Sequence, residues 1–123
     1  MMLKIKTLVL GASLNSSKYS NKAVLSLVNN GFEVEAIGNK IGRIYGVNIV
    51  KSIQEIPDKI DTISLYLNAK NQENYIADLL KLKPRRIIFN PGTENIKFAK
   101  LAESKGVEVI EGCTLVMLSL KQY

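Results

Sequence analysis

The sequence contains no histidine, a single cysteine and no long run of apolar residues. Without histidine it lacks the commonest general base, the Ser–His catalytic pairs and most zinc sites. The one cysteine, Cys113, has no partner for an internal disulfide. No run of about 18 apolar residues occurs, so no membrane-spanning helix is predicted. At 123 residues, the chain is expected to form one domain over residues 1–123. Since its first residues lack an export signal, we also expect a cytoplasmic location.

The net charge of +6 points to an anionic partner. Nucleic-acid-binding domains usually gather their lysines and arginines on one element, often with interleaved aromatic residues. Here the basic residues are scattered, and the nearest to a cluster lies within 81–86. That run follows a predicted helix, where cations meet the negative end of the helix dipole. We therefore expect a small nucleotide cofactor as partner, with no nucleic acid and no membrane, and either a monomer or a homodimer.

Short apolar runs alternate with longer amphipathic ones, which is typical of repeated βα units. Strands are expected at 5–10, 32–37, 61–67, 86–90 and 107–110, with a short edge strand at 47–50. Helices are expected at 20–30, 71–82, 94–105 and 113–120, with a single helical turn at 52–57. Right-handed crossovers then place helices on both faces of the sheet. The sequence predicts a single Rossmann-like, three-layer α/β domain with a mostly parallel sheet of five to six strands.

The loop after the first predicted strand is rich in small and polar residues. Gly11 lets the backbone turn sharply at the strand end, and Ala12 and Ser13 keep the approach to the backbone open. Several hydroxyl and amide side chains then precede a helix, whose first N–H groups attract anions. Ser20 alone is enough to cap that helix. The additional polar residues therefore favour a phosphate-binding loop over a helix cap.

Two common phosphate-binding motifs do not match this loop. The G-x-x-x-x-G-K-[ST] motif is absent, and Ser13 and Ser16 stand at the later glycine positions of G-x-G-x-x-G. After the second strand an NAD site usually has Asp or Glu, where this chain has Gly38-Asn39-Lys40. Lys40 suits a phosphate on the ribose, as in coenzyme A or NADP. A solvated lysine in a turn explains the same residue equally well.

Two later strand ends are expected to reach the same edge of the sheet. Asn68-Ala69 has the character of a helix start, and Asn90-Pro91-Gly92 that of a turn. Each segment is compatible with a plain connection or with a ligand contact. Cys113 opens the last predicted helix, where the dipole can lower a thiol pKa, but we interpret it as an inert thiol because it has no histidine partner. We therefore expect a binding domain with no catalytic and no metal-ligating residues.

Eight segments along the chain stand out by their order and spacing: Gly11-Ala12-Ser13, Asn15, Ser17-Lys18-Tyr19-Ser20, Lys22-Ala23, Gly38-Asn39-Lys40, 52–57, 89–95 and 111–114. Together they resemble the small CoA-binding domain proteins, stand-alone relatives of the N-terminal domain of the succinyl-CoA synthetase α subunit. The resemblance covers nearly the whole chain, and its specificity lies in the order and spacing of the segments. The family tends to have Asn-Pro-Lys where this chain has Gly38-Asn39-Lys40.

The resemblance implies a coenzyme A or acyl-CoA ligand and a site for each part of it. Lys40 is expected near the ribose phosphate or adenine. The residues implied along the pyrophosphate and pantetheine path are Gly11, Ser13, Ser17, Lys18 and Tyr19. Those implied to close the groove are Asn68, Ala69, Asn90, Pro91 and Gly92. The turn that carries Lys40 lacks the family's proline, so its backbone is expected to differ from that of the family. Synthetase activity is not implied, because the phosphorylated histidine and its domain are absent.

Three hypotheses follow. The first is a non-catalytic protein that binds coenzyme A or acyl-CoA with the loop after the first strand. The second is an NADP-binding oxidoreductase or redox sensor of the same fold, suggested by Lys40 but weakened by the missing third glycine. The third is an interaction subunit that keeps the fold and has lost the ligand.

Overall fold

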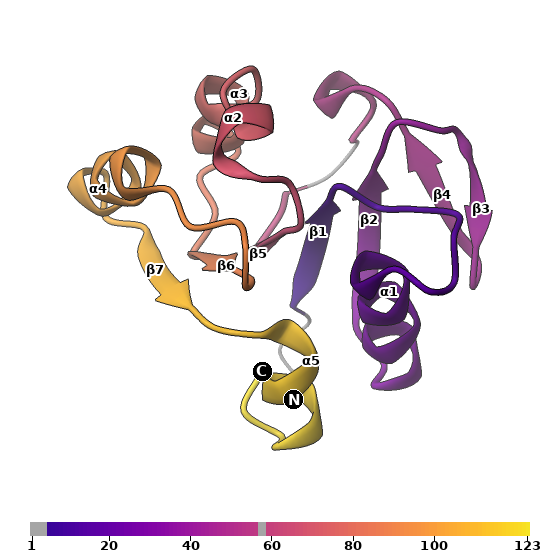
Figure 1. Cartoon of the computed structure of the whole chain (residues 1–123). Helices are drawn as coiled ribbons and strands as arrows, with labels where there is room; N and C mark the ends of the chain where they lie inside the picture. The colour runs from indigo at the N-terminus through magenta and orange to yellow at the C-terminus, as the bar shows by residue number, and fades with distance from the viewer. Residues whose placement is uncertain (1–4, 57–58) are drawn as a thin grey trace.

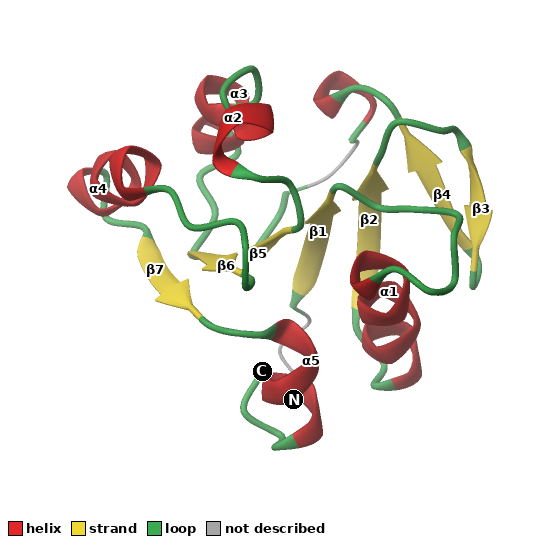
Figure 2. Cartoon of the chain, in the orientation of Figure 1, coloured by secondary structure: helices red, strands yellow, loops and turns green. Residues whose placement is uncertain are grey.

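The computed structural model describes residues 5–56 and 59–123, which form a seven-stranded sheet with helices on both faces (Figures 1 and 2). The strands are β1 (Lys6–Leu10), β2 (Glu33–Ile37), β3 (Gly42–Ile44), β4 (Val47–Val50), β5 (Thr62–Leu65), β6 (Arg86–Phe89) and β7 (Glu108–Glu111). The helices are α1 (Tyr19–Asn29), the 3-10 turn η1 (Ile53–Glu55), α2 (Ala69–Gln72), α3 (Ile76–Lys81), α4 (Ile96–Ser104) and α5 (Thr114–Ser119). The strand order is β3-β4-β2-β1-β5-β6-β7. The predicted α/β fold with a mostly parallel sheet is confirmed.

Two hydrophobic cores lie on opposite faces of the sheet. Successive side chains of a strand point to opposite faces, so Leu8 and Leu10 of β1 join one core and Val9 joins the other. The first core is closed by side chains of α3 and α4, and the second by side chains of α1 and α5. The three predicted layers are therefore present, with β1 near the centre of the sheet.

The edge of the sheet differs from the prediction. β4 is an inner strand, because it pairs in parallel with β2 and antiparallel with β3. The additional strand β3 brings the sheet to seven strands, above the predicted five to six. Tyr45 and Gly46 join β3 to β4 with φ of 50° and 83°, the positive pair that a two-residue hairpin needs. A non-glycine residue rarely adopts this conformation, so the sequence did not indicate the hairpin.

The helix predicted at 71–82 is two short helices, α2 and α3, separated by a turn at residues 73–75. The buried amide of Gln72 donates to the carbonyl oxygens of Leu67 and Thr93 at 2.8 and 2.7 Å. This anchors α2 to the loops that follow β5 and β6. Leu79 of α3 is meanwhile packed in the first core. The break between the helices lets Gln72 bind these loops while Leu79 packs in the first core.

Two smaller expectations concern helix ends. The predicted turn at 52–57 is η1, begun by a capping box between Ser52 and Glu55; Pro57, expected to end it, lies outside the described residues. The helix predicted from Ser20 begins at Tyr19, with Lys18 in the N-cap position. Ser20 is therefore not the N-cap.

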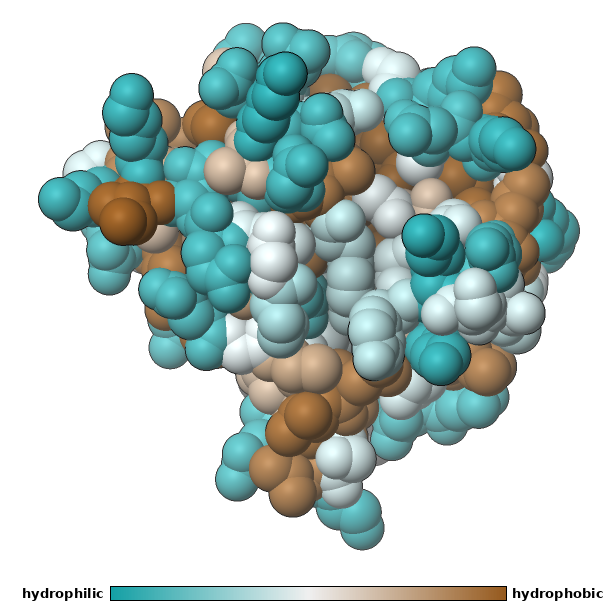
Figure 3. Space-filling model, in the orientation of Figure 1, coloured by the Kyte–Doolittle hydropathy of each residue, from teal (hydrophilic) through white to brown (hydrophobic). Residues whose placement is uncertain are grey.

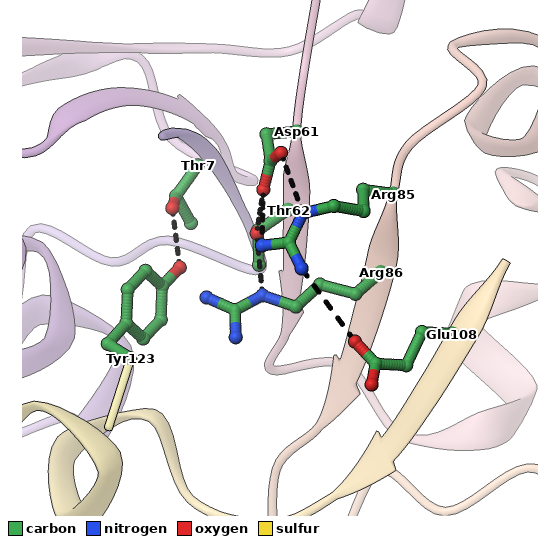
Figure 4. Close-up of polar contacts among 7 residues, drawn as sticks. All are labelled: Thr7, Asp61, Thr62, Arg85, Arg86, Glu108 and Tyr123. Atoms are coloured by element: carbon green, nitrogen blue, oxygen red, sulfur yellow. Dashed lines mark hydrogen bonds and ion pairs between the residues drawn. The ribbon is translucent and has the colours of Figure 1, made fainter. Parts of the chain in front are cut away.

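At the amino-terminal edge of the sheet, the basic run near residue 85 is built into the fold (Figure 4). The guanidinium of Arg85 donates twice to Asp61, at 3.0 and 3.1 Å. Burial opposes ionisation of Asp61. The hydrogen bonds from Arg85 and Thr62, together with the charges of Arg85 and Arg86, outweigh burial and hold the pKa of this carboxyl below its ordinary value of 3.8. Arg86 is buried, donates to Thr62 and stacks 4.4 Å from the ring centroid of Tyr123. These two arginines therefore belong to the framework of the strand ends.

Candidate functional site

A groove of about 840 Å³ lies where β1, β2 and β5 end. The arrows of β1 and β2 point upward in Figure 1. The walls of the groove include Leu10 and Ile37, the last residues of β1 and β2, and Tyr66, which directly follows β5. From β1 the chain continues to β2 on one side, whereas β5 and β6 lie on the other. The groove thus occupies the topological switch point, where ligands of open parallel sheets bind.

The backbone of the loop after β1 is held against the end of β2. The N–H groups of Gly11 and Ala12 both donate to the carbonyl oxygen of Ile37, at 2.8 and 2.9 Å. Gly11 has φ +98°, and a Cβ at this position would lie 3.0 Å from the backbone carbon of Tyr66. Gly38, after β2, has its Cα against the carbonyl oxygen of Ala12, and a Cβ there would overlap this oxygen. Two glycines thus let three chain segments meet at the groove.

The polar residues of the loop fold it into a compact turn. The side-chain oxygen of Asn15 accepts hydrogen bonds from the N–H and hydroxyl of Ser17, at 2.9 and 2.7 Å. The carbonyl oxygen of Asn15 accepts from the N–H of Lys18 at 3.0 Å. No side chain among the described residues caps the start of α1. The first turn of this helix therefore keeps N–H groups for an anion.

Two lysines reach the groove from separate segments. Lys18 precedes α1 and Lys40 follows β2; both are exposed and both line the groove. Tyr19 also lines it, with 70% of its surface exposed and the Lys22 ammonium 5.5 Å from its ring centroid. The part of the groove near β2 and α1 is therefore positively charged. In the view of Figure 3, by contrast, hydrophobic side chains gather over α5, where Val116 and Leu120 are exposed.

The groove brings together most of the residues that the sequence suggested for the site. Those that line it are Gly11, Ala12, Ser13, Lys18, Tyr19, Asn39, Lys40 and Pro91. Those that do not line it are Ser17, Asn68, Ala69, Asn90 and Gly92.

The residues outside the lining have structural roles. Ser17 is bound to Asn15, and Asn68 caps α2 by accepting from the N–H of Asn71 at 2.9 Å. Ala69 is the first residue of α2, and the N–H of Gly92 donates to Glu94. Asn90 was suggested as a groove residue, but only 1% of its surface is exposed. The physical reason is its place at the end of an inner strand, where its amide joins neighbouring segments inside the protein.

Several lining residues were not singled out from the sequence, among them Leu14, Tyr66, Leu67 and Tyr75. Tyr66 and Leu67 follow β5 directly, so the strand-end rule is the signal that would have found them. Tyr75 reaches the groove because the chain breaks between α2 and α3, which no sequence pattern indicated. Burial raises the pKa of Tyr66 to about 12, although the neighbouring hydroxyls of Ser64 and Thr114 act to lower it. Its phenol therefore stays protonated at neutral pH.

Two absences concern residues 5–56 and 59–123. In these residues no helix has the length and apolar character needed to cross a membrane. The same residues hold no group of three or more Cys, Asp or Glu side chains placed to bind a metal ion. Cys113, half-buried, precedes α5 and is a free thiol.

Comparison with known proteins decides the family. A model of the "CoA binding domain" family matches residues 6–119. The chain belongs to the CoA-binding domain family. The crystal structure of an uncharacterised protein is 38% identical, with TM-score 0.93 over 99% of this chain and 100% of that one. A Thermus thermophilus protein shares the fold of this CoA-binding domain, with TM-score 0.88 at 17% identity over 98% and 91% of the two chains.

The fold also occurs within a larger enzyme. An acetyl-coenzyme A synthetase of Candidatus Korarchaeum cryptofilum, solved with phosphate and ADP, matches with TM-score 0.73 and 20% identity. The match covers 87% of this CoA-binding domain and 25% of the synthetase chain. No curated protein matches the sequence.

Proposed function

We propose that this protein binds coenzyme A or an acyl-CoA in the groove, with the pyrophosphate at the loop Gly11-Ala12-Ser13 and the start of α1. The observation that carries the proposal is the uncapped N-terminus of α1 beside Lys18 and Lys40, both of which line the groove. Helix N-terminal N–H groups and lysine ammonium groups are the donors that phosphates take in proteins. The family match over residues 6–119 supports coenzyme A as the ligand.

The character of the walls supports one orientation of the ligand. The β2 side of the groove carries Lys40, whereas the β5 and β6 side carries Leu67, Tyr75 and Pro91. Coenzyme A has the same asymmetry, with phosphates at the nucleotide end and an uncharged pantetheine arm. We place the ribose phosphate near Lys40 and the pantetheine arm along the uncharged side.

A carrier or sensor of coenzyme A fits this groove better than an enzyme. The sequence has no histidine, and Tyr66, with its raised pKa, is a poor base at neutral pH. The groove supplies groups that hold a polyphosphate. We therefore infer that this chain binds the cofactor without transforming it.

Isothermal titration calorimetry tests the ligand. We expect binding of coenzyme A, weaker binding of dephospho-CoA, and no measurable binding of pantetheine, because the phosphates carry the charged contacts. NADPH is titrated in parallel because Lys40 also suits the ribose phosphate of that cofactor. Tight binding of NADPH with no binding of coenzyme A or acetyl-CoA at millimolar concentration would replace this proposal by the NADP hypothesis. If neither coenzyme A nor NADPH binds, the interaction-subunit hypothesis is favoured.

The role of Lys40 is a separate prediction. Lys40→Ala is expected to weaken binding of coenzyme A by about tenfold to a hundredfold, because a charge-assisted phosphate contact contributes about 1.5–3 kcal/mol. Dephospho-CoA is expected to bind the variant and the unchanged protein nearly alike. Lys105→Ala is the matched control, since Lys105 is an exposed lysine after α4 and does not line the groove. Equal losses of affinity for both ligands would show that Lys40 does not contact the ribose phosphate.

A further inference from the structure

The amide of Asn21 joins the loop after β1 (residues 11–18, here called the phosphate loop) to the hairpin of β3 and β4. Asn21 lies in the first turn of α1 with 1% of its surface exposed. Its Nδ2 donates to the carbonyl oxygen of Ser13 at 2.9 Å, and its Oδ1 accepts from the hydroxyl of Tyr45 at 2.6 Å. Buried amides need partners at both ends, and these two bonds supply one for each. Ser13 and Tyr45 are thereby connected through one side chain.

The bond to Ser13 affects the charge that the loop presents. A carbonyl oxygen directed at an anion would repel it, whereas N–H groups attract it. The carbonyl oxygen of Ser13 is engaged by the buried amide of Asn21. This bond therefore holds the negative end of that peptide group away from a phosphate and leaves the loop's positive groups to face the groove.

The hairpin supports the loop at a second point. Leu14 of the loop lies over Gly42, the first residue of β3, so closely that a Cβ on Gly42 would meet its side chain. Tyr45 forms the hairpin turn with Gly46, and Lys40 stands two residues before β3. One hairpin thus braces the loop after β1 and also follows directly on the turn that carries Lys40.

We propose that Asn21 and Tyr45 are positioning residues that hold the phosphate loop in its binding conformation and in register with Lys40. The consequence for affinity rests on the proposed function, whereas the consequence for the loop does not. Tyr45 is 40% exposed and stands 24 residues from Asn21 in the sequence. Its hydroxyl acts on the ligand only through Asn21 and the loop.

Hydrogen exchange of the ligand-free protein is the first test. In Tyr45→Phe, the backbone amides of residues 13–17 are expected to exchange at least about fivefold faster, because a lost hydrogen bond is worth about 1 kcal/mol. Amides of β6 are expected to be unchanged. Asn48→Ala is the matched control, because it removes a side-chain bond of the same hairpin, from Arg43 at 3.0 Å, without touching the loop. Equal exchange of residues 13–17 in Tyr45→Phe and Asn48→Ala overturns the proposal.

Affinity is the second test. Tyr45→Phe is expected to weaken the binding of coenzyme A and of dephospho-CoA by the same factor, about fivefold, because both ligands carry the pyrophosphate. Asn21→Asp keeps the acceptor for Tyr45 and loses the donor to Ser13. It is expected to weaken the binding of both ligands more than Tyr45→Phe does. Faster loop exchange with unchanged affinities overturns the role in binding. If the unchanged protein binds neither ligand, the proposed function fails, and the exchange result still decides whether Tyr45 holds the loop.

Discussion

Replacing Gly11 with alanine is expected to lower the free energy of unfolding by about 3 kcal/mol, the combined cost of a left-handed backbone on a residue with Cβ and of an overpacked contact. Gly11 has φ +98°, and the added Cβ would lie 3.0 and 3.1 Å from the backbone carbon and oxygen of Tyr66. Backbone atoms at the end of an inner strand have little freedom to move. The substitution is therefore also expected to displace the loop and to weaken the binding of coenzyme A by more than tenfold.

Gly31→Ala is the matched control for this prediction. Gly31 follows α1 with φ +83°, and a Cβ there would have no neighbour within 4 Å. The two variants share the backbone cost, about 1 kcal/mol, and differ in the contact. Urea denaturation measures both. If Gly11→Ala costs no more than Gly31→Ala, the loop is not packed against β5 as described, and its rigidity is not what shapes the groove.

Asn90→Ala is expected to have a similarly large effect, about 3 kcal/mol of unfolding free energy, because it removes three buried hydrogen bonds at once. The Nδ2 of Asn90 donates to the hydroxyl of Ser64 at 2.9 Å and to the carbonyl oxygen of Leu65 at 2.8 Å. Its Oδ1 accepts from the N–H of Thr114 at 2.8 Å. One amide therefore joins β5, β6 and the start of α5.

Asn68→Ala provides the comparison for Asn90. Asn68 is exposed and caps α2 with a single bond, so its loss is expected to cost about 1 kcal/mol. Both asparagines were suggested as groove residues from the sequence, and denaturation separates their roles. A small loss for Asn90→Ala together with a large loss of coenzyme A affinity would show that Asn90 acts at the ligand instead of in the framework.

Patterns local to one element predicted most of the fold. Strands 5–10, 61–67 and 86–90 were expected from their apolar runs, and β1, β5 and β6 lie within them. β3 was missed, because three residues carry no period and its hairpin depends on a positive φ at Tyr45. The break between α2 and α3 was missed because it depends on what Gln72 contacts across the groove loops.

The candidate site was predictable to the extent that it is a property of strand ends. The loop at Gly11 and the turn at Lys40 follow neighbouring parallel strands, so their residues necessarily approach the same edge of the sheet. Tyr66 and Leu67 obey the same rule and were overlooked. Tyr75 obeys no such rule, because it reaches the groove through the packing of α3.

By itself, the sequence determined that β1 ends in a glycine turn before an amphipathic helix, at the edge where ligands bind. It also lacks histidine, and the binding role without catalysis that we inferred from this stays a prediction. The tertiary structure decided which polar side chains face the groove and which are buried beneath it. Asn21 and Asn90 are polar residues, yet each is 1% exposed and joins separate segments. Burial depends on what packs around a residue, and those neighbours come from distant parts of the chain.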